Sequence, residues 1–329
     1  MTSFGYRAAM SLPFMPLFAA LLAVAACAQA PDVPIHTDAG ATTPDPVEAK
    51  LTAAAEKLRA SGDLLGIPAL REQMARTTCE LTLPKPRDVA LTGPQVWRAA
   101  RAAFVTIGFH YKCTQCDEWH LDTGGGYAIA ANGIVATCRH VIAPNDEEMR
   151  EGFLFCADDA GNVYPVREVL ACDEDSDTAI LRTDAVKLVP LPLRTDVVPG
   201  ETAYSYSEPM GTRGYFSSGI VNRFAYEPIE NRPQARIVMN VSTDWAPGSS
   251  GAAVMDAFGN AIGHACAIST HGEEIEASED EKAEDGAAPP SHGQETYMVL
   301  HMAVRAADVL ARIRPKTAAP QAVPAETKH

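Results

Sequence analysis

The chain has 329 residues, of which 47% are hydrophobic and 21% are charged. This composition is typical of globular proteins and excludes an intrinsically disordered or fibrous chain. The formal net charge of −15 argues against a protein that neutralises nucleic-acid phosphates, so nucleic acid is not an expected partner. The length suits two domains of about 150 residues or one larger all-β fold with short additions.

The N-terminal segment is apolar. Residues 8–26 contain no charged residue, and Arg7 is the only charge before them. Pro13 and Pro16 interrupt the run, and small residues gather at its end. These features predict a secretory signal over residues 1–26, with an uncleaved membrane anchor as the alternative.

Two cleavage sites compete at the end of this signal. Residues 24–27, VAAC, resemble a bacterial lipobox, and AQA at 28–30 offers an ordinary site. We favour the lipobox, which would make Cys27 a lipidated residue that attaches the protein to a membrane without crossing it. Either site predicts export, to the cell envelope as a lipoprotein or to the periplasm or the exterior.

Cysteine usage agrees with export, because disulfides persist in oxidising compartments. Seven cysteines remain after Cys27, so up to three disulfides are expected, with one thiol left over and the pairing undetermined. They are Cys79, Cys113, Cys116, Cys138, Cys156, Cys172 and Cys266.

Residues 27–93 are rich in Ala, Pro and Thr. Within them, residues 46–60 place Val47, Leu51, Ala55 and Leu58 on one helical face. We interpret the segment as a tether with a docking helix, and a regulatory propeptide is the alternative.

From residue 94 the pattern changes to a dozen short β-rich runs separated by Gly, Asn and Asp turns. Such a series without long intervening helices predicts an all-β sandwich or a pair of barrels over residues 94–315. A terminal helix is expected at 303–313, and residues 316–329 should be a disordered tail. Residues 272–286 carry eight acidic residues against Lys282 and predict a solvated loop.

Three motifs in this region contain residues suited to nucleophilic catalysis. Residues 124–141 predict a hairpin that turns on Asn132-Gly133 and presents His140 at the end of its second strand. Asp177 follows an acidic turn and precedes an apolar strand, where a carboxylate could orient a histidine. Singly, these residues could equally be a structural histidine and a turn aspartate.

The third motif surrounds Ser250. The small residues of PGSSGA at 247–252 allow a sharp turn that could aim the amides of Gly248 and Ser250 at one point, as an oxyanion hole requires. Alone, such a loop could be a flexible turn. The order His, Asp, Ser differs from the Ser, Asp, His order of α/β-hydrolases, whose Gly-x-Ser-x-Gly motif is also broken here by Ala252.

Together with SEPMG at 207–211 and SGIV at 218–221, these motifs resemble the trypsin-like serine peptidases of the chymotrypsin fold. The similarity is to their bacterial branch, which includes the high-temperature-requirement proteases, but no peptide-binding module is expected after residue 315. The resemblance implies an all-β fold of two six-stranded barrels, with the active site between them, a C-terminal helix and an N-terminal helical or disordered tether.

The resemblance also implies roles for individual residues. Ser250 would be the nucleophile, His140 the general base and then acid, and Asp177 the orienting carboxylate, with the amides of Gly248 and Ser250 as the oxyanion hole. Asp244 lies at the spacing of the carboxylate at the base of the trypsin-like specificity pocket, which would favour basic P1 residues. The expected partners are protein or peptide substrates, and no cofactor is implied. A catalytically silent envelope binding protein with the same fold is the alternative.

A separate cluster precedes the glycine-rich hairpin. Cys113, Cys116 and His120 lie within eight residues, and Asp117 stands where a haem-attachment motif needs histidine. A disulfide is the expected state in an exported protein. A metal site is the weaker alternative, because zinc would need a fourth ligand.

Overall fold

The computed structural model describes residues 46–62, 64–229, 232–275 and 293–316. These residues belong to one compact unit, residues 36–329. The predicted signal at 1–26, Cys27, most of the acidic segment and residues 317–329 lie outside them. Within the described ranges, none of the helices has the length and apolar character that crossing a bilayer demands.

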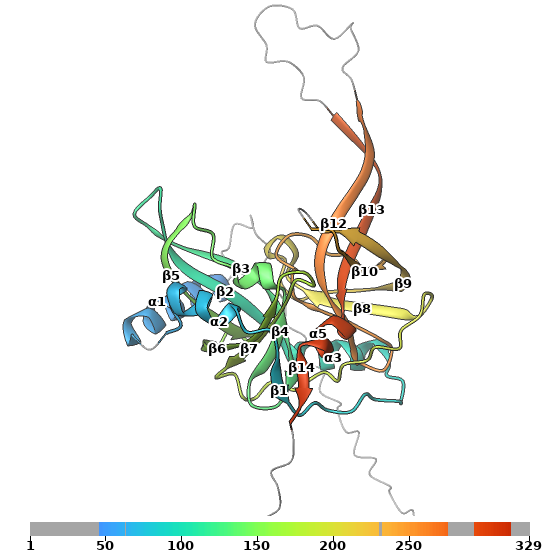
Figure 1. The fold of residues 1–329 in the computed structure, drawn as a ribbon, viewed down its shortest axis with the longest axis horizontal. Helices are drawn as coiled ribbons and strands as arrows, with labels where there is room; N and C mark the ends of the chain where they lie inside the picture. The colour runs from blue at the N-terminus through green and yellow to red at the C-terminus, as the bar shows by residue number, and fades with distance from the viewer. Residues whose placement is uncertain (1–45, 63, 230–231, 276–292, 317–329) are drawn as a thin grey trace, which may run out of the picture. The chain divides into compact units, whose positions relative to one another are not determined.

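Six strands close into a first antiparallel barrel (Figure 1). Around the barrel they follow the order β2 (Phe104–Cys113), β3 (Trp119–Ala130), β4 (Ile134–Thr137), β7 (Thr178–Thr183), β6 (Val163–Asp173) and β5 (Met149–Asp158). The predicted hairpin is present between β3 and β4, and Asn132 and Gly133 adopt φ values of 63° and 72°. The β-branched and aliphatic side chains of these strands form the main core.

A second barrel contains the other half of the sheet structure. Its order is β10 (Ala235–Val241), β13 (Gly293–Arg305), β12 (Ala261–Ile275), β11 (Ala253–Met255), β8 (Thr202–Ser207) and β9 (Tyr215–Pro228). The expectation of two six-stranded barrels is therefore confirmed.

Strands β12 and β13 remain paired as far as Ile275 and Gly293 and project as a ribbon (Figure 1). Residues 272–275 of the predicted acidic loop therefore belong to β12.

The N-terminal elements pack on the barrels. Helix α1 (Pro46–Ser61) has the predicted apolar face and buries Leu51 and Ala55 against Phe153 and Phe155 of β5. Helix α2 (Ile67–Met74) adds Ile67 and Leu70 to the main core. From residue 46 onward the expected tether is thus part of the folded unit, because its apolar side chains are buried against β5.

Two further elements differ from the sequence expectation. Helix α3 (Gly93–Ala103), which no sequence pattern had indicated, begins with a capping box between Thr92 and Gln95 and buries Val96 and Ala100. The terminal helix α5 (Ala306–Ala311) is shorter than the predicted 303–313, because β13 stays paired with β12 through Arg305.

A short parallel pair joins the segment after α2 to the segment after α5. Strand β1 (Cys79–Leu81) lies beside β14 (Ile313–Pro315). Between β1 and α3, the chain contacts the second barrel, where the Leu91 amide donates to the Ala257 carbonyl over 2.8 Å. The N-terminal segment therefore contacts both barrels.

The seven cysteines from Cys79 to Cys266 are all free thiols, so the structure does not contain the expected disulfides. Cys79, Cys156 and Cys172 face Ile313, Tyr164 and Ala179 across their strand pairs. None of these three strand partners is another cysteine, so direct cross-strand pairing offers them no disulfide.

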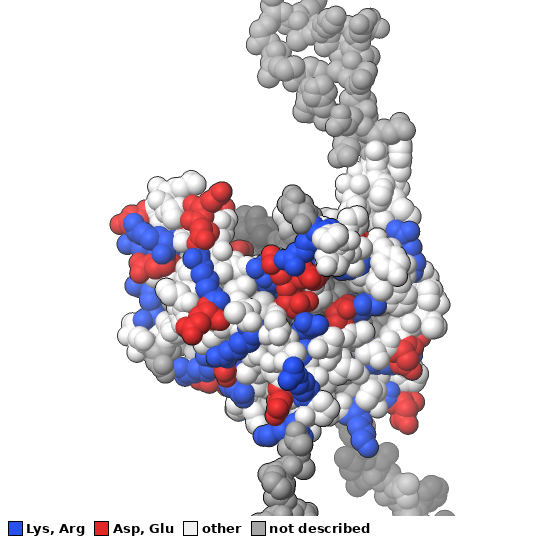
Figure 2. Space-filling model, viewed as in Figure 1, with Lys and Arg blue, Asp and Glu red and all other residues white. Residues whose placement is uncertain are grey.

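Charges are mixed on the surface shown in Figure 2. Lys and Arg alternate there with Asp and Glu, and no continuous basic area is visible on this face. The charged residues of the described chain form several ion pairs, such as Arg167 with Asp184 and Arg305 with Asp308.

Candidate active site

His140 lies in a single helical turn, α4 (Arg139–Ile142), directly after β4. Its imidazole is half exposed, with 48% of the side-chain surface accessible. The ring Nδ1 lies 2.7 Å from Asp177 Oδ2, and the His140 amide donates to Asp177 Oδ1 over 2.9 Å. Two contacts to one carboxylate fix the imidazole orientation, as a general base requires.

Asp177 occupies the turn between β6 and β7 and has 8% of its surface exposed. Its φ of 54° lies in the left-handed region, which is rare for a residue with a side chain and often marks functional sites. Burial raises the pKa of this carboxyl, but hydrogen bonds and the charge interaction with His140, together with a hydrogen bond from Cys266, outweigh burial and lower the pKa to about 2. Asp177 is therefore ionised at neutral pH.

Ser250 lies in the loop before β11, which is held against the first barrel. The Gly125 amide donates to the Ser250 carbonyl over 2.7 Å. A Cβ added at Gly125 would lie 2.8 Å from the Ala252 amide nitrogen, so only glycine allows this approach. The glycine-rich start of the predicted hairpin thus positions the serine loop.

The amides proposed for the oxyanion hole are available. The Ser249 amide donates to the Ala246 carbonyl, whereas those of Gly248 and Ser250 have no hydrogen-bond acceptor within the described part of the chain. Gly248 has a φ of 95°, and a Cβ there would lie 2.8 Å from the Glu208 carbonyl oxygen. The SEPMG segment at 207–211 therefore packs against the loop that contains Gly248 and Ser250.

Cys266 connects the serine to the aspartate. Its thiol donates to Asp177 Oδ2 over 3.2 Å, and its carbonyl accepts from Ser250 Oγ over 3.3 Å. In the described structure, Ser250 Oγ makes this contact and no hydrogen bond to His140. The structure therefore brings His140, Asp177 and Ser250 to one place between the barrels, with the serine turned toward Cys266.

The sequence motifs did not indicate that Cys266 and Cys138 belong to this site. Cys138 is fully buried beside Cys266, its thiol donates to the Ala265 carbonyl, and burial raises its pKa well above the ordinary value. An inert, protonated thiol at this position fills space behind Asp177.

Replacement of Cys266 by alanine should lower kcat about tenfold or less with little change in KM, because one hydrogen bond that positions Asp177 is lost. Cys266→Ser should restore the rate, since a hydroxyl also donates. Steady-state kinetics of both variants test this, with Cys156→Ala as a control for removal of a buried thiol. Equal rates for Cys266→Ala and the unchanged protein would contradict a positioning role.

His264 lies between the barrels, completely buried, with its ring 6.1 Å from that of Tyr127. Within the described residues, neither ring nitrogen has a hydrogen-bond partner. Burial lowers the pKa of His264 to about 4 from the ordinary 6.5. The folded protein thus holds this imidazole neutral where the unfolded chain would take up a proton.

As the pH falls from 6.5 to 4, protonation of His264 in the unfolded chain should therefore lower the free energy of unfolding by about 3 kcal/mol. Urea unfolding at a series of pH values measures this slope. His264→Leu should flatten the curve in that interval, whereas His271→Gln, at an exposed histidine, should leave it unchanged. An unaltered slope in His264→Leu would refute the assignment.

A cavity of about 160 Å³ opens beside Ser250. Apart from Ser250 and Cys266, its lining is apolar: Trp245, Ala246, Pro247, Ala267 and Ile268. Asp244 is exposed and does not line the cavity, and its carboxylate accepts from the Tyr215 hydroxyl over 3.4 Å. The Asp244 carboxylate, which was expected at the base of the specificity pocket, therefore lies outside this cavity.

Within the described ranges, two groups of side chains have donor atoms suited to a metal. One is Cys138 with His140 and Asp177, and the other is Cys113 with Cys116 and His120. In the first group, the His140 ring is hydrogen-bonded to the Asp177 carboxylate, and the Cys138 thiol donates to the Ala265 carbonyl. These donor atoms therefore already have partners within the protein. The second group lies at the tip of the β2–β3 hairpin, so the structure does bring the three predicted residues together.

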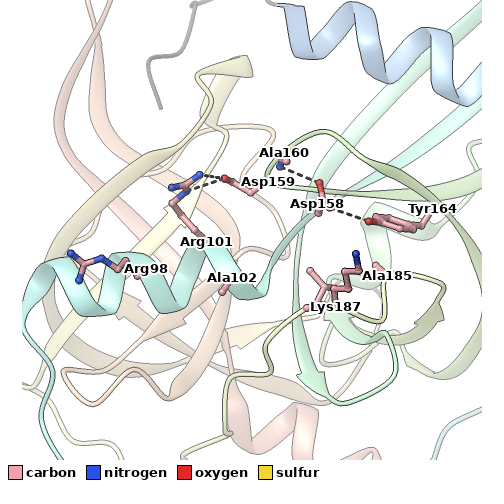
Figure 3. Close-up of a pocket in the computed structure, with 10 residues that line it drawn as sticks. Arg98, Arg101, Ala102, Asp158, Asp159, Ala160, Tyr164, Ala185 and Lys187 are labelled. Atoms are coloured by element: carbon pink, nitrogen blue, oxygen red, sulfur yellow. Dashed lines mark hydrogen bonds and ion pairs between the residues drawn. The ribbon is translucent and has the colours of Figure 1, made fainter. Parts of the chain in front are cut away.

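Another cavity, of about 370 Å³, contains none of the catalytic candidates. Figure 3 shows it, with Arg101 paired to Asp159 at its edge over 2.5 Å and the Tyr164 hydroxyl bonded to Asp158. Lysine and arginine side chains are part of its wall.

Residues 124–263 match the sequence model of the trypsin-like peptidase domain family. Residues 124–263 are therefore similar to trypsin-like peptidase domains. The match includes His140, Asp177 and Ser250, and the double barrel of the peptidase domain agrees with the expected chymotrypsin-like architecture.

Among curated proteins, the chain is similar to Protease Do-like 1, chloroplastic, from Arabidopsis thaliana. The two are 32% identical over 108 residues, which is 31% of this chain and 24% of the relative. The chain thus spans about a quarter of the length of that relative.

Proposed function

We propose that this protein is an exported serine endopeptidase that hydrolyses peptide bonds through an acyl-enzyme. The observation that carries the proposal is the His140–Asp177 pair, with its ionised, buried carboxylate, near Ser250. In the described part of the chain, the amides of Gly248 and Ser250 donate to no acceptor, so they could bind an oxyanion. The family match supports the same reaction.

The residues would act in the following order. Ser250 Oγ rotates from the Cys266 carbonyl toward His140, transfers its proton to Nε2 and attacks the substrate carbonyl carbon. The amides of Gly248 and Ser250 bind the resulting oxyanion, and Asp177 stabilises the imidazolium. His140 then protonates the leaving amine, and water releases the acyl group by the same steps in reverse.

Labelling with a fluorophosphonate tests whether Ser250 is activated. We expect a covalent adduct on Ser250, located by peptide mass spectrometry, that is absent from Ser250→Ala and greatly reduced in His140→Ala. Ser249→Ala, at the adjacent serine, is the matched control and should keep the adduct. No adduct on the folded protein would instead favour the silent binding protein.

Export and lipidation rest on sequence. The uncharged run at 8–26 and the VAAC segment support an anchor at Cys27, which would hold the peptidase at a membrane surface. Mass spectrometry of the mature N-terminus tests this: a diacylglyceryl group on Cys27 supports the proposal, and an unmodified N-terminus beginning at residue 31 refutes it.

The cavity beside Ser250 supports an apolar P1 residue rather than a basic one. Its volume is close to the roughly 150 Å³ that accommodates benzene in an apolar cavity, and its apolar lining gives no counter-charge to lysine or arginine. We therefore propose that medium-sized apolar P1 side chains are preferred.

Peptides that differ only at P1 should show a higher kcat/KM for Leu than for Arg. Ala267→Val, which narrows the pocket, should lower kcat/KM for P1 Leu by about 10-fold or more relative to P1 Ala. Asp244→Asn should leave the Leu to Arg ratio unchanged. A preference for Arg that Asp244→Asn abolishes would restore the basic specificity expected from sequence.

A further inference from the structure

Three metal-binding side chains converge at the tip of the β2–β3 hairpin. Cys113 ends β2, and Cys116 and His120 follow in the turn and at the start of β3. The Sγ atoms of both cysteines and a ring nitrogen of His120 all lie within 4.8 Å of one another. Both thiols are free, and the peptidase mechanism uses none of the three.

The turn is shaped to support a negatively charged sulfur. The backbone amides of Gln115 and Cys116 both point to Cys113 Sγ, with nitrogen-to-sulfur distances of 3.3 and 3.5 Å. Amide hydrogen bonds to sulfur stabilise a thiolate, which is the form that binds metal. This arrangement comes from the backbone, so it does not depend on the rotamer of another side chain.

His120 is oriented toward the second sulfur. Its Nε2 lies 2.9 Å from Cys116 Sγ, and its ring packs beside that of Tyr111, its cross-strand partner, at 5.7 Å. Tetrahedral zinc, with Zn–S near 2.3 Å and Zn–N near 2.0 Å, holds its ligand atoms about 3.5 to 3.8 Å apart. Small side-chain rotations would bring the three atoms to that spacing.

Two further residues of the hairpin tip, Thr114 and Asp117, are held by contacts of their own, and Asp117 is therefore not a further metal ligand. Thr114 bonds through its amide to the Glu148 carbonyl and through its hydroxyl to the Glu147 carbonyl. The Asp117 carboxylate pairs with Lys112 and Arg150. The loop is thus held to the start of β5, which limits the entropy lost when a metal binds.

We propose that Cys113, Cys116 and His120 form a site for a thiophilic divalent cation, Zn²⁺, with water in the remaining position. Two thiolates and one imidazole are a donor set that zinc prefers over calcium or magnesium. Such an ion would join the end of β2 to the start of β3. The site is independent of the proposed peptidase activity.

Titration with Co²⁺, a spectroscopic substitute for zinc, tests the site on the protein reduced with a phosphine. We expect one equivalent to bind with sulfur-to-cobalt charge-transfer bands and intense tetrahedral d–d bands, and Zn²⁺ to displace it. Cys116→Ser and His120→Gln should each weaken binding by more than the roughly 10- to 100-fold that loss of a supporting residue causes. Both side chains are exposed, so these variants should fold normally.

Cys79→Ser and His271→Gln are the matched controls and should bind as the unchanged protein does. The proposal is overturned if the unchanged protein gives no charge-transfer band, or if Cys116→Ser and His120→Gln bind Co²⁺ as tightly as the controls. It is also overturned if the protein isolated without reductant carries a Cys113–Cys116 disulfide that excludes zinc. Circular dichroism before titration verifies that each variant is folded.

Discussion

Replacing Ser250 by alanine should reduce kcat for peptide-bond hydrolysis by about 10⁶-fold. The hydroxyl is the only group at this position that can form the acyl-enzyme, and its loss leaves substrate binding and the amides of Gly248 and Ser250 in place. The residual rate should therefore still exceed that in water, with KM little changed. Hydrolysis of an unfolded protein such as casein, followed by mass spectrometry of the products, measures the effect.

Ser249→Ala provides a matched control for this experiment. The Ser249 side chain is completely buried and its hydroxyl has no hydrogen-bond partner within the described residues. Its removal should therefore change kcat only slightly. If Ser250→Ala retains the activity of the unchanged protein, another nucleophile or a contaminating protease performs the hydrolysis, and the proposed mechanism is wrong.

Replacing Asp177 by asparagine should lower kcat by about 10⁴-fold at neutral pH. The amide preserves the shape of the side chain but can donate to His140 Nδ1, which would favour the wrong tautomer and leave no charge to stabilise the imidazolium. The loss should appear in kcat rather than in KM. Glu174→Gln, at an exposed acidic residue of the same turn, should have little effect.

The pH dependence of the unchanged protein gives a second test of Asp177. Because its pKa is lowered to about 2, the carboxylate stays ionised throughout the range in which the protein is assayed. Asp177 should consequently contribute no ionisation to the acid limb of the activity profile above pH 3. An ionisation in that range that Asp177→Asn removes would show that the carboxylate is not held as the structure indicates.

The sequence was sufficient to predict the fold class, and it singled out three residues that the structure brings together. His140, Asp177 and Ser250 each lie in a short motif with its own turn or glycine signal, and the order of the motifs favoured one family over another. The β-rich runs indicated the barrels because strand alternation and turn residues are local properties.

Contacts between distant residues could not be predicted in the same way. Cys266 lies 89 residues from Asp177 in sequence, and nothing in its local pattern indicates that its thiol reaches that carboxylate. The apolar face of α1 was visible in the sequence, but its docking on Phe153 and Phe155 was not. For Asp244, the sequence suggested a contact that the structure does not contain. Its spacing from Ser250 predicted a place in the specificity pocket, but its side chain is exposed to solvent.

The parallel pairing of β1 with β14 has a mechanical consequence. Force applied between the N-terminal helices and β14 would first detach α1 and α2 from the first barrel and then reach β1. Because β1 and β14 are parallel, pulling the start of one against the end of the other loads their hydrogen bonds in shear, so that the bonds resist together instead of opening one at a time. Because both barrels lie between β1 and β14 in the chain, this strand pair would bear the force before the barrels do. The spacing between His140 and Ser250 would therefore be preserved under tension.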